Sequence, residues 1–144
     1  MPASTPIAIA DAVAARLQAG AFSLPIQVQR GYRPVVDLSA LTGVTVTVVP
    51  KSLSISAATR ADGFCDCAVD VGVQAKVDPE SLADLDALMR LVEELGDSLR
   101  LSPLAGVPGA TWLSLANEPI FAPEHLEQQH VLTSVLTVTY RVRR

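Results

Sequence analysis

The sequence has few of the residues that build disulfide scaffolds, aromatic binding platforms or membrane spans. It contains two cysteines and 4% aromatic residues in 144. Two cysteines cannot form a disulfide framework at this size, and so few aromatic side chains cannot stack a run of bases. The apolar runs are interrupted well before the roughly 18 residues that a membrane span needs, and the first ten residues do not resemble a secretory signal. These absences predict a protein without a membrane partner that folds in a reducing cytoplasm.

The composition is that of one folded domain. Hydrophobic residues make up 49% of the chain and charged residues 18%, which excludes disorder of the whole chain. The length suits a single domain over residues 1–144. Eleven basic and fifteen acidic residues give a net charge of -4, which argues mildly against nucleic-acid binding.

Helical spacing of apolar residues predicts two amphipathic helices. The first covers about residues 6–19, because Thr5 and Pro6 form a typical helix start and Gly20 a typical end. The second covers about residues 82–101 and follows an acidic helix start. Its leucines and valines recur at helical spacing, so one of its faces is apolar.

Alternation of apolar and polar residues predicts the strands, over residues 25–32, 44–50, 64–77 and 131–142. A further short strand over residues 110–115 is left open. The strand over residues 64–77 alternates most regularly, and at about 3.3 Å per residue it exceeds ~40 Å. That length is greater than the core of so small a domain requires.

The element order α-β-β-β-α-(β)-β predicts an α+β fold. We expect a two-layer arrangement, a mostly antiparallel sheet with the two helices packed on one face. Two connections are expected to be irregular. One is an extended polar loop near residues 51–63, and the other is a proline-rich arm near residues 102–130.

No motif in the sequence carries recognisable chemistry. Cys65 and Cys67 point to the same side of a strand, but zinc requires four ligands and no second pair exists. Packing of both cysteines on the inner face of the sheet is the preferred interpretation. A small metal-binding module, in which His125 and His130 join the two cysteines, remains an alternative. The chain has neither a nucleophile elbow nor a glycine-rich phosphate loop, so we predict no enzyme, no catalytic residue and no cofactor.

The basic residues are mostly arginine, nine against two lysines. Guanidinium groups bind carboxylates with two hydrogen bonds, so this content favours ion pairs at protein interfaces. Six of the arginines lie in or near strands, loops and the C-terminus. A nucleic-acid-binding stripe built from them would bind with an affinity that falls steeply with salt.

The layout resembles the tail terminator (tail-completion) proteins of long-tailed phages and prophages. The resemblance covers almost the whole chain and rests on element order and short stretches, without a catalytic motif. These stretches are residues Ala19–Phe22, Arg30–Pro34, Val48–Lys51, Asp70–Lys76, Asp86–Leu95, Phe121–Glu127 and Thr133–Arg141.

This resemblance implies a virion structural protein in the tail or neck, assembled in the host cytoplasm. Tail terminators form a homo-oligomeric ring, usually a hexamer, on the head-proximal end of the tail tube. There they stop tube growth and present a surface to head-completion proteins, while DNA passes through the lumen without specific binding. Neck and head-closure (head–tail connector) proteins of similar size are the alternative role.

A ring subunit must offer two different surfaces to its neighbours. We expect the interface to use aromatic and charged residues in or beside the long strands, the loop and the arm. These candidate residues are Lys51, Arg60, Phe64, Trp112, Phe121 and Arg141. Burial of Trp112 in its own core is an equally good interpretation. Asp66 and Asp70, on the polar face of a strand, are hypothesised to face the lumen.

Overall fold

The computed structural model describes residues 5–32, 43–57, 63–78, 80–100, 104, 106–107, 109–117, 121 and 123–143, without the side chains of residues 125 and 129. Its elements are, in chain order, α1 (Thr5–Ala19), β1 (Ile26–Arg30), β2 (Val44–Ala57), β3 (Gly63–Lys76), α2 (Leu82–Leu99), β4 (Thr111–Asn117), α3 (Pro123–Gln129) and β5 (Val131–Arg143).

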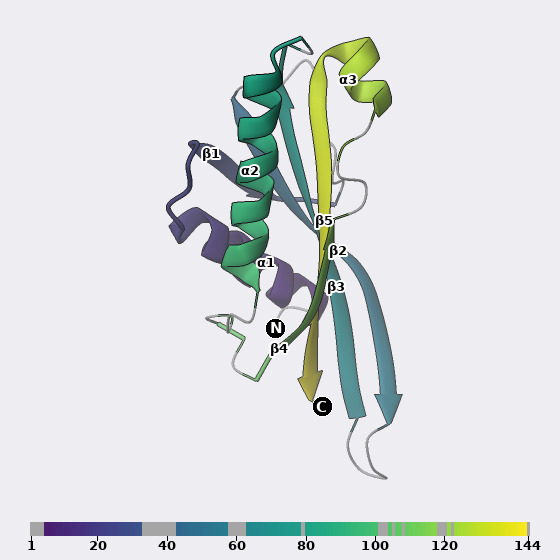
Figure 1. Cartoon of the computed structure of the whole chain (residues 1–144). Helices are drawn as coiled ribbons and strands as arrows, with labels where there is room; N and C mark the ends of the chain where they lie inside the picture. The colour runs from purple at the N-terminus through teal and green to yellow at the C-terminus, as the bar shows by residue number, and fades with distance from the viewer. Residues whose placement is uncertain are drawn as a thin grey trace.

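The five strands form one sheet in the order β1-β2-β3-β5-β4. All neighbouring strands are antiparallel except β1 and β2, which are parallel. Helices α1 and α2 pack on the same side of this sheet (Figure 1). The predicted α+β class is therefore confirmed, and the strand that was left open is present as β4. The short helix α3 was not predicted.

The core lies between the two long helices and the face of the sheet that they cover. Ile9, Val13 and Leu17 of α1 are fully buried there, as are Leu91 and Leu95 of α2. From the sheet, the same cluster receives alternate residues of the central strands, Cys67, Val69, Val71, Val73, Leu136, Val138 and Tyr140 among them. The alternation read from the sequence of β3 thus corresponds to its buried face.

Gly96 of helix α2 lies beside Leu115 of β4. A glycine inside a helix costs about 1 kcal/mol relative to alanine, so its presence calls for a reason. A Cβ atom at Gly96 would lie 3.4 Å from the Leu115 side chain of β4. A side chain at position 96 would come into van der Waals contact with Leu115, so the glycine leaves room for Leu115 beside the helix.

The prediction of an extended loop near residues 51–63 is wrong for residues 51–57. This segment continues β2, and the register shift between Pro50 and Ser52 leaves Lys51 as an extra, bulged residue. Proline lacks an N–H group, so a bulge tolerates it where a regular ladder would not. The three serines after the bulge suggested a loop, although they alternate with apolar residues as in a strand. Residues 58–62 lie outside the described part.

The bulge also determines which residues at the end of β2 lie on the helix-covered face of the sheet. Before it, Val46 and Val48 point into the core. After it, Leu53 pairs with Cys67 and Ile55 pairs with Cys65, so these odd-numbered residues occupy the same face. Without the extra residue the serines would lie there instead.

The proline-rich arm expected over residues 102–130 contains regular structure. Strand β4 joins the sheet by pairing with β5, and α3 begins at Pro123, a residue suited to the first turn of a helix. Alternating apolar residues are few in β4, which explains why the sequence left it open. Three prolines of the arm fall on residues that the structure does not describe.

Candidate assembly interface

The ends of β2, β3 and β5 extend past the helices and form an arm of the sheet (Figure 1). We call residues Lys51–Ala57, Gly63–Ala68 and Thr139–Arg143 the distal arm. Every residue of its β2 part is exposed, including the large apolar side chains of Leu53 and Ile55. The β2 part of the distal arm therefore offers surface that the core does not cover, whereas Cys65, Cys67 and Tyr140 on its other two strands are buried.

On the face of the distal arm opposite to the helices, Phe64, Asp66 and Arg141 form a cluster. Cross-strand pairing sets Asp66 directly opposite Arg141. The guanidinium donates from Nε to Oδ1 at 2.8 Å and from Nη2 to Oδ2 at 3.0 Å. The same guanidinium lies 4.9 Å from the centre of the Phe64 ring, within the range of a cation–π contact. Two of the predicted interface residues are thus brought together.

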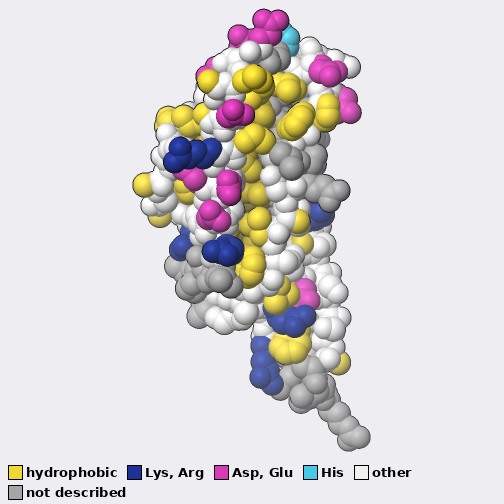
Figure 2. All heavy atoms as spheres, viewed as in Figure 1, with side chains coloured by type: hydrophobic (Ala, Val, Ile, Leu, Met, Phe, Trp, Pro, Cys, Tyr) yellow, Lys and Arg dark blue, Asp and Glu magenta, His cyan; other side chains and the backbone are white. Residues whose placement is uncertain are grey.

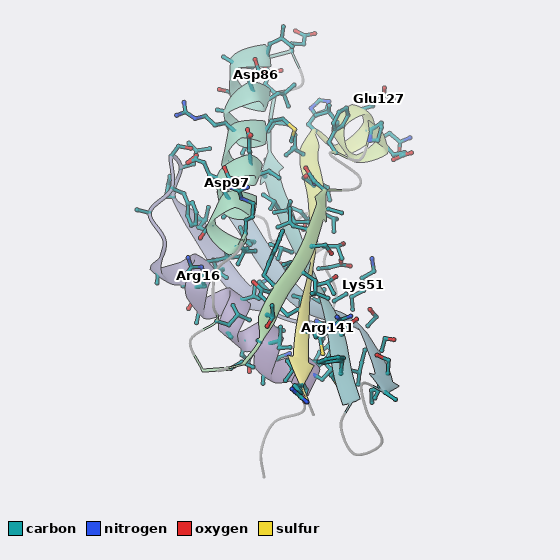
Figure 3. The ribbon with its side chains drawn as sticks, turned by 60° about the horizontal axis from the view of Figure 1, so that its bottom comes forward. Arg16, Lys51, Asp86, Asp97, Glu127 and Arg141 are labelled. Carbon is teal, nitrogen blue, oxygen red and sulfur yellow. The ribbon has the colours of Figure 1, made fainter. Side chains whose placement is uncertain are left out.

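A second cluster lies next to the first on the same face. Asp70 accepts a hydrogen bond of 2.6 Å from the Thr137 hydroxyl, and the Lys51 ammonium lies 3.7 Å from the same carboxylate. In Figure 3, Lys51 and Arg141 lie toward the same end of the sheet.

The sequence places Asp66 and Asp70 on the polar face of the strand, and there both carboxylates are partly exposed and paired with cations. The side chain of Asp66 is 28% exposed and that of Asp70 is 15% exposed, and each has a cationic partner. Their negative charge is compensated locally. The basis for placing them in a lumen as free negative charge is correspondingly reduced.

The Asp66–Arg141 pair makes a testable contribution to acid stability. The hydrogen bonds from Arg141 lower the pKa of Asp66 below its ordinary value of 3.8. A lowered folded-state pKa stabilises the folded protein above pH 3.8, and this stabilisation is lost as the pH falls through the folded-state value. We expect Asp66→Asn to lower the Tm by about 1–3 °C at pH 7, with the difference closing below pH 3.8.

Thermal melts of both proteins between pH 7 and pH 2 measure this difference. Asp86→Asn, on an exposed position of α2, is the control for loss of one carboxylate from the net charge. A constant difference between wild type and Asp66→Asn at every pH would contradict the prediction.

The residues of the alternative metal site do not come together. Neither Cys65 nor Cys67 forms a disulfide, and both are fully buried on the core face of β3, as the packing interpretation predicted. His130 lies at the other end of the sheet, beside the end of β3 at Val77. His125 belongs to α3, but its side chain is not described. Within the described ranges, no three His, Cys, Asp or Glu residues are grouped to hold a metal ion.

An apolar groove of about 430 Å³ runs between α2 and the β4 edge of the sheet. Figure 2 shows it as part of a strip of hydrophobic side chains that passes beside acidic ones. The apolar lining comes from Met89, Val92, Trp112, Leu115 and Leu136. Glu93, Asp97 and Arg100 also line the groove, from α2 and the residue that follows it.

Trp112 was interpreted either as an interface residue or as a residue of its own core, and its position has features of both. It packs against the core, yet it is partly exposed and lines the groove. Its indole Nε1 is buried and has no hydrogen-bond partner among the described residues. Phe121, after β4, is exposed, and Arg60 lies outside the described part of the chain.

Sequence reasoning missed several exposed apolar side chains that the structure reveals, among them Tyr32, Leu53 and Ile55. The alternation of Leu53 and Ile55 with serines was the available signal for the latter two. Tyr32 follows β1, and the guanidinium of Arg30 lies 5.2 Å from the centre of its ring. The tyrosine itself is 70% exposed, which makes it a candidate contact residue.

The fold defines the chain as an α+β domain with a five-stranded sheet and helices on one side. No family model matches the sequence, and none of the curated proteins matches it. A chain from the virion of a native gene transfer agent particle has the same fold, with a TM-score of 0.64 at 16% identity, over 99% of this chain and 100% of the other. The sheath/tube terminator of an extracellular contractile injection system, in its extended state, gives a TM-score of 0.47 at 16% identity, over 100% of this chain and 58% of the other.

The first of these likenesses shows the fold of the chain along its full length. None of the helices in the described ranges is long and apolar enough to cross a membrane.

Proposed function

We propose that this chain is a structural protein of a phage-type virion, a tail terminator that forms a ring on the head-proximal end of the tail tube. The observation that carries the proposal is the full-length likeness in fold to a chain of a gene transfer agent virion, at a TM-score of 0.64. The resemblance of the sequence to tail terminators supplies the specific role. No catalytic step and no cofactor belong to this function.

The geometry supports a ring because the subunit has two different surfaces with apolar side chains that its own core leaves exposed. A closed ring uses a heterologous interface, in which one surface of each subunit binds another surface of the next. The distal arm carries the exposed Leu53 and Ile55 on one side of the molecule. The apolar groove beside β4 lies at the opposite edge of the sheet.

In this role the ring binds a tail tube protein on one side and a head-completion or neck protein on the other. The usual stoichiometry of tail terminators makes a hexamer the expected assembly. Its central opening would pass DNA without binding it specifically, consistent with arginines that are already paired, such as Arg30 with Asp11 and Arg141 with Asp66.

The test is the solution mass of the purified protein, measured by light scattering over a concentration series with and without tail tube protein. We expect a discrete ring mass, either alone or on addition of tube protein, and rings that cap tube ends in electron micrographs. Rings that bind head proteins but not tail tubes would indicate the neck or head-closure role instead. A strict monomer that is indifferent to both partners would refute the proposal.

A further inference from the structure

The two edges of the sheet are both open along part of their length. Strand β4 is the last strand on one side, and in the described part of the chain only β5 pairs with it. On the other side, β1 pairs with β2 only from Val44 to Val48. The final bond there runs from the Gly31 N–H to the Val48 carbonyl at 2.9 Å. Beyond Val48, no described strand covers the outer edge of β2.

The two open edges lie at the same level along the strands. Thr111 of β4 is connected with Ser54 of β2 through successive cross-strand partners in β5 and β3, so the two residues lie in one row across the sheet. In the same way Asn117 lies in one row with Val48. Strand β4 therefore stands level with the part of β2 that begins where β1 ends. A ring with its axis along the strands would bring these two edges together without a shift.

Strand direction also matches. Strands β3 and β4 both run antiparallel to β5, and β3 runs antiparallel to β2, so β4 is antiparallel to β2. Rotation about an axis along the strands leaves each strand direction unchanged. The β4 strand of one copy would therefore meet β2 of the next in the antiparallel sense, which gives the slightly more stable ladder.

In such a pairing, the exposed apolar side chains of β2 and the apolar side chains of β4 lie on the same face of the sheet. Leu53 and Ile55 lie on the helix-covered face of the sheet, because they pair with the buried cysteines of β3. Trp112 and Leu115 of β4 lie on that same face, because they pair with Tyr140 and Val138. In a continuous sheet, Leu53 and Ile55 of one copy would cover the open side of the groove in the other.

Charged and aromatic residues also lie at this place. The α2 wall of the groove has two acidic residues, Glu93 and Asp97, and Arg100 follows the helix there. Tyr32 follows β1 and is 70% exposed, and β1 ends level with Val48 and therefore with the Asn117 end of β4. A second copy would bring this tyrosine toward the α2 wall.

We propose that, in the ring, β4 of one subunit pairs antiparallel with residues 49–54 of β2 in the next subunit. The sheet then continues from subunit to subunit, and Leu53 and Ile55 seal the apolar groove of the neighbour. The occupant of the groove is a second copy of this chain. This inference rests on the proposed ring function and identifies the surfaces that form it.

Engineered disulfides test the pairing. Ser114 of β4 is level with Ser52 of β2, and both lie on the face opposite to the helices. Directly opposed residues of an antiparallel pair have Cα atoms about 4.5–5.5 Å apart, within disulfide reach. Three double variants combine Ser114→Cys with Ser52→Cys, Ser54→Cys or Ser56→Cys. The native Cys65 and Cys67 are fully buried, and the single variants control for them.

After oxidation of ring-forming samples, we expect a ladder of covalent oligomers for Ser52→Cys, or for Ser54→Cys if the strands tilt within the ring. The Ser56→Cys combination and all single variants should stay monomeric on a non-reducing gel. The solution mass of each variant is measured by light scattering under reducing conditions, which shows whether the variant forms rings. Rings without any cross-link, or with equal cross-linking in all three series, would overturn the interface alone. Samples without rings would overturn the proposed function and the interface with it.

Discussion

Replacement of Ile55 by lysine should leave a folded monomer that no longer forms rings. The Ile55 side chain is 60% exposed on the distal arm, so its removal costs the isolated subunit little. In the proposed interface the same side chain lies beside Leu53, at the Trp112 end of the groove of the next copy. A lysine there would place a charge in an apolar contact and on a strand edge, where charge opposes strand pairing.

The solution mass of Ile55→Lys, together with its circular dichroism spectrum and Tm, measures both parts of this prediction. The matched control is Leu82→Lys, because Leu82 is also an exposed large apolar residue, at 72%, but lies at the start of α2 away from both open edges. We expect rings from the control and monomers from Ile55→Lys, with Tm values near that of the wild type. Rings of normal mass from both variants would exclude the distal arm from the interface.

Two substitutions of Tyr140 should shift stability in opposite directions. Its ring is fully buried in the core, so Tyr140→Ala should lower the free energy of unfolding by about 3–5 kcal/mol. Its hydroxyl is also buried, and it has no hydrogen-bond partner among the described residues. Tyr140→Phe removes this unsatisfied group while keeping the ring, and should raise the free energy of unfolding by about 1 kcal/mol.

The same hydroxyl predicts a difference at alkaline pH. Burial raises the pKa of Tyr140 from its ordinary 10.0 to about 12, opposed in part by the positive charge of Arg16. Between these values the unfolded chain releases the phenolic proton and the folded chain retains it, so stability falls as the pH rises. A shift of about two units corresponds to roughly 2–3 kcal/mol in favour of the unfolded state once the pH exceeds both values, and to about half of that at pH 11. Tyr140→Phe has no such proton and should not show this loss.

Urea denaturation of wild type, Tyr140→Phe and Tyr140→Ala at pH 7 and pH 11 measures these free energies. Tyr140→Phe serves as the reference for the other groups that titrate in this range, because it shares them with the wild type and lacks only the phenolic proton. A Tyr140→Phe variant that is less stable than wild type at pH 7 would show that the hydroxyl has a favourable partner.

The distal arm illustrates how assembly and stability are separated in this subunit. Residues that hold the fold together, such as Leu95 and Val71, lie between the helices and the centre of the sheet. Residues assigned to assembly, such as Ile55, lie where the strands have passed the helices. Variants in the second group should therefore change ring formation at nearly constant stability.

The sequence alone determined the elements whose signal is local. The fourteen-residue alternation of β3 and the leucine pattern of α2 each specify a period, and a period specifies an element and its buried face. The class of fold follows from the order of such elements. For the interface, Phe64, Lys51 and Arg141 were selected because aromatic and charged residues beside long strands are suited to contacts between subunits.

Only the tertiary structure decided what depends on residues far apart in the chain. The Asp66–Arg141 pair joins positions 75 residues apart, and only the register of β3 against β5 brings them together. The bulge at Lys51 turns Leu53 and Ile55 to the helix side, a choice that serine-rich composition concealed. The equal level of the two open edges follows from the pairing of four strands in succession. Local periodicity carries none of this information, because cross-strand register is set by packing of the whole sheet.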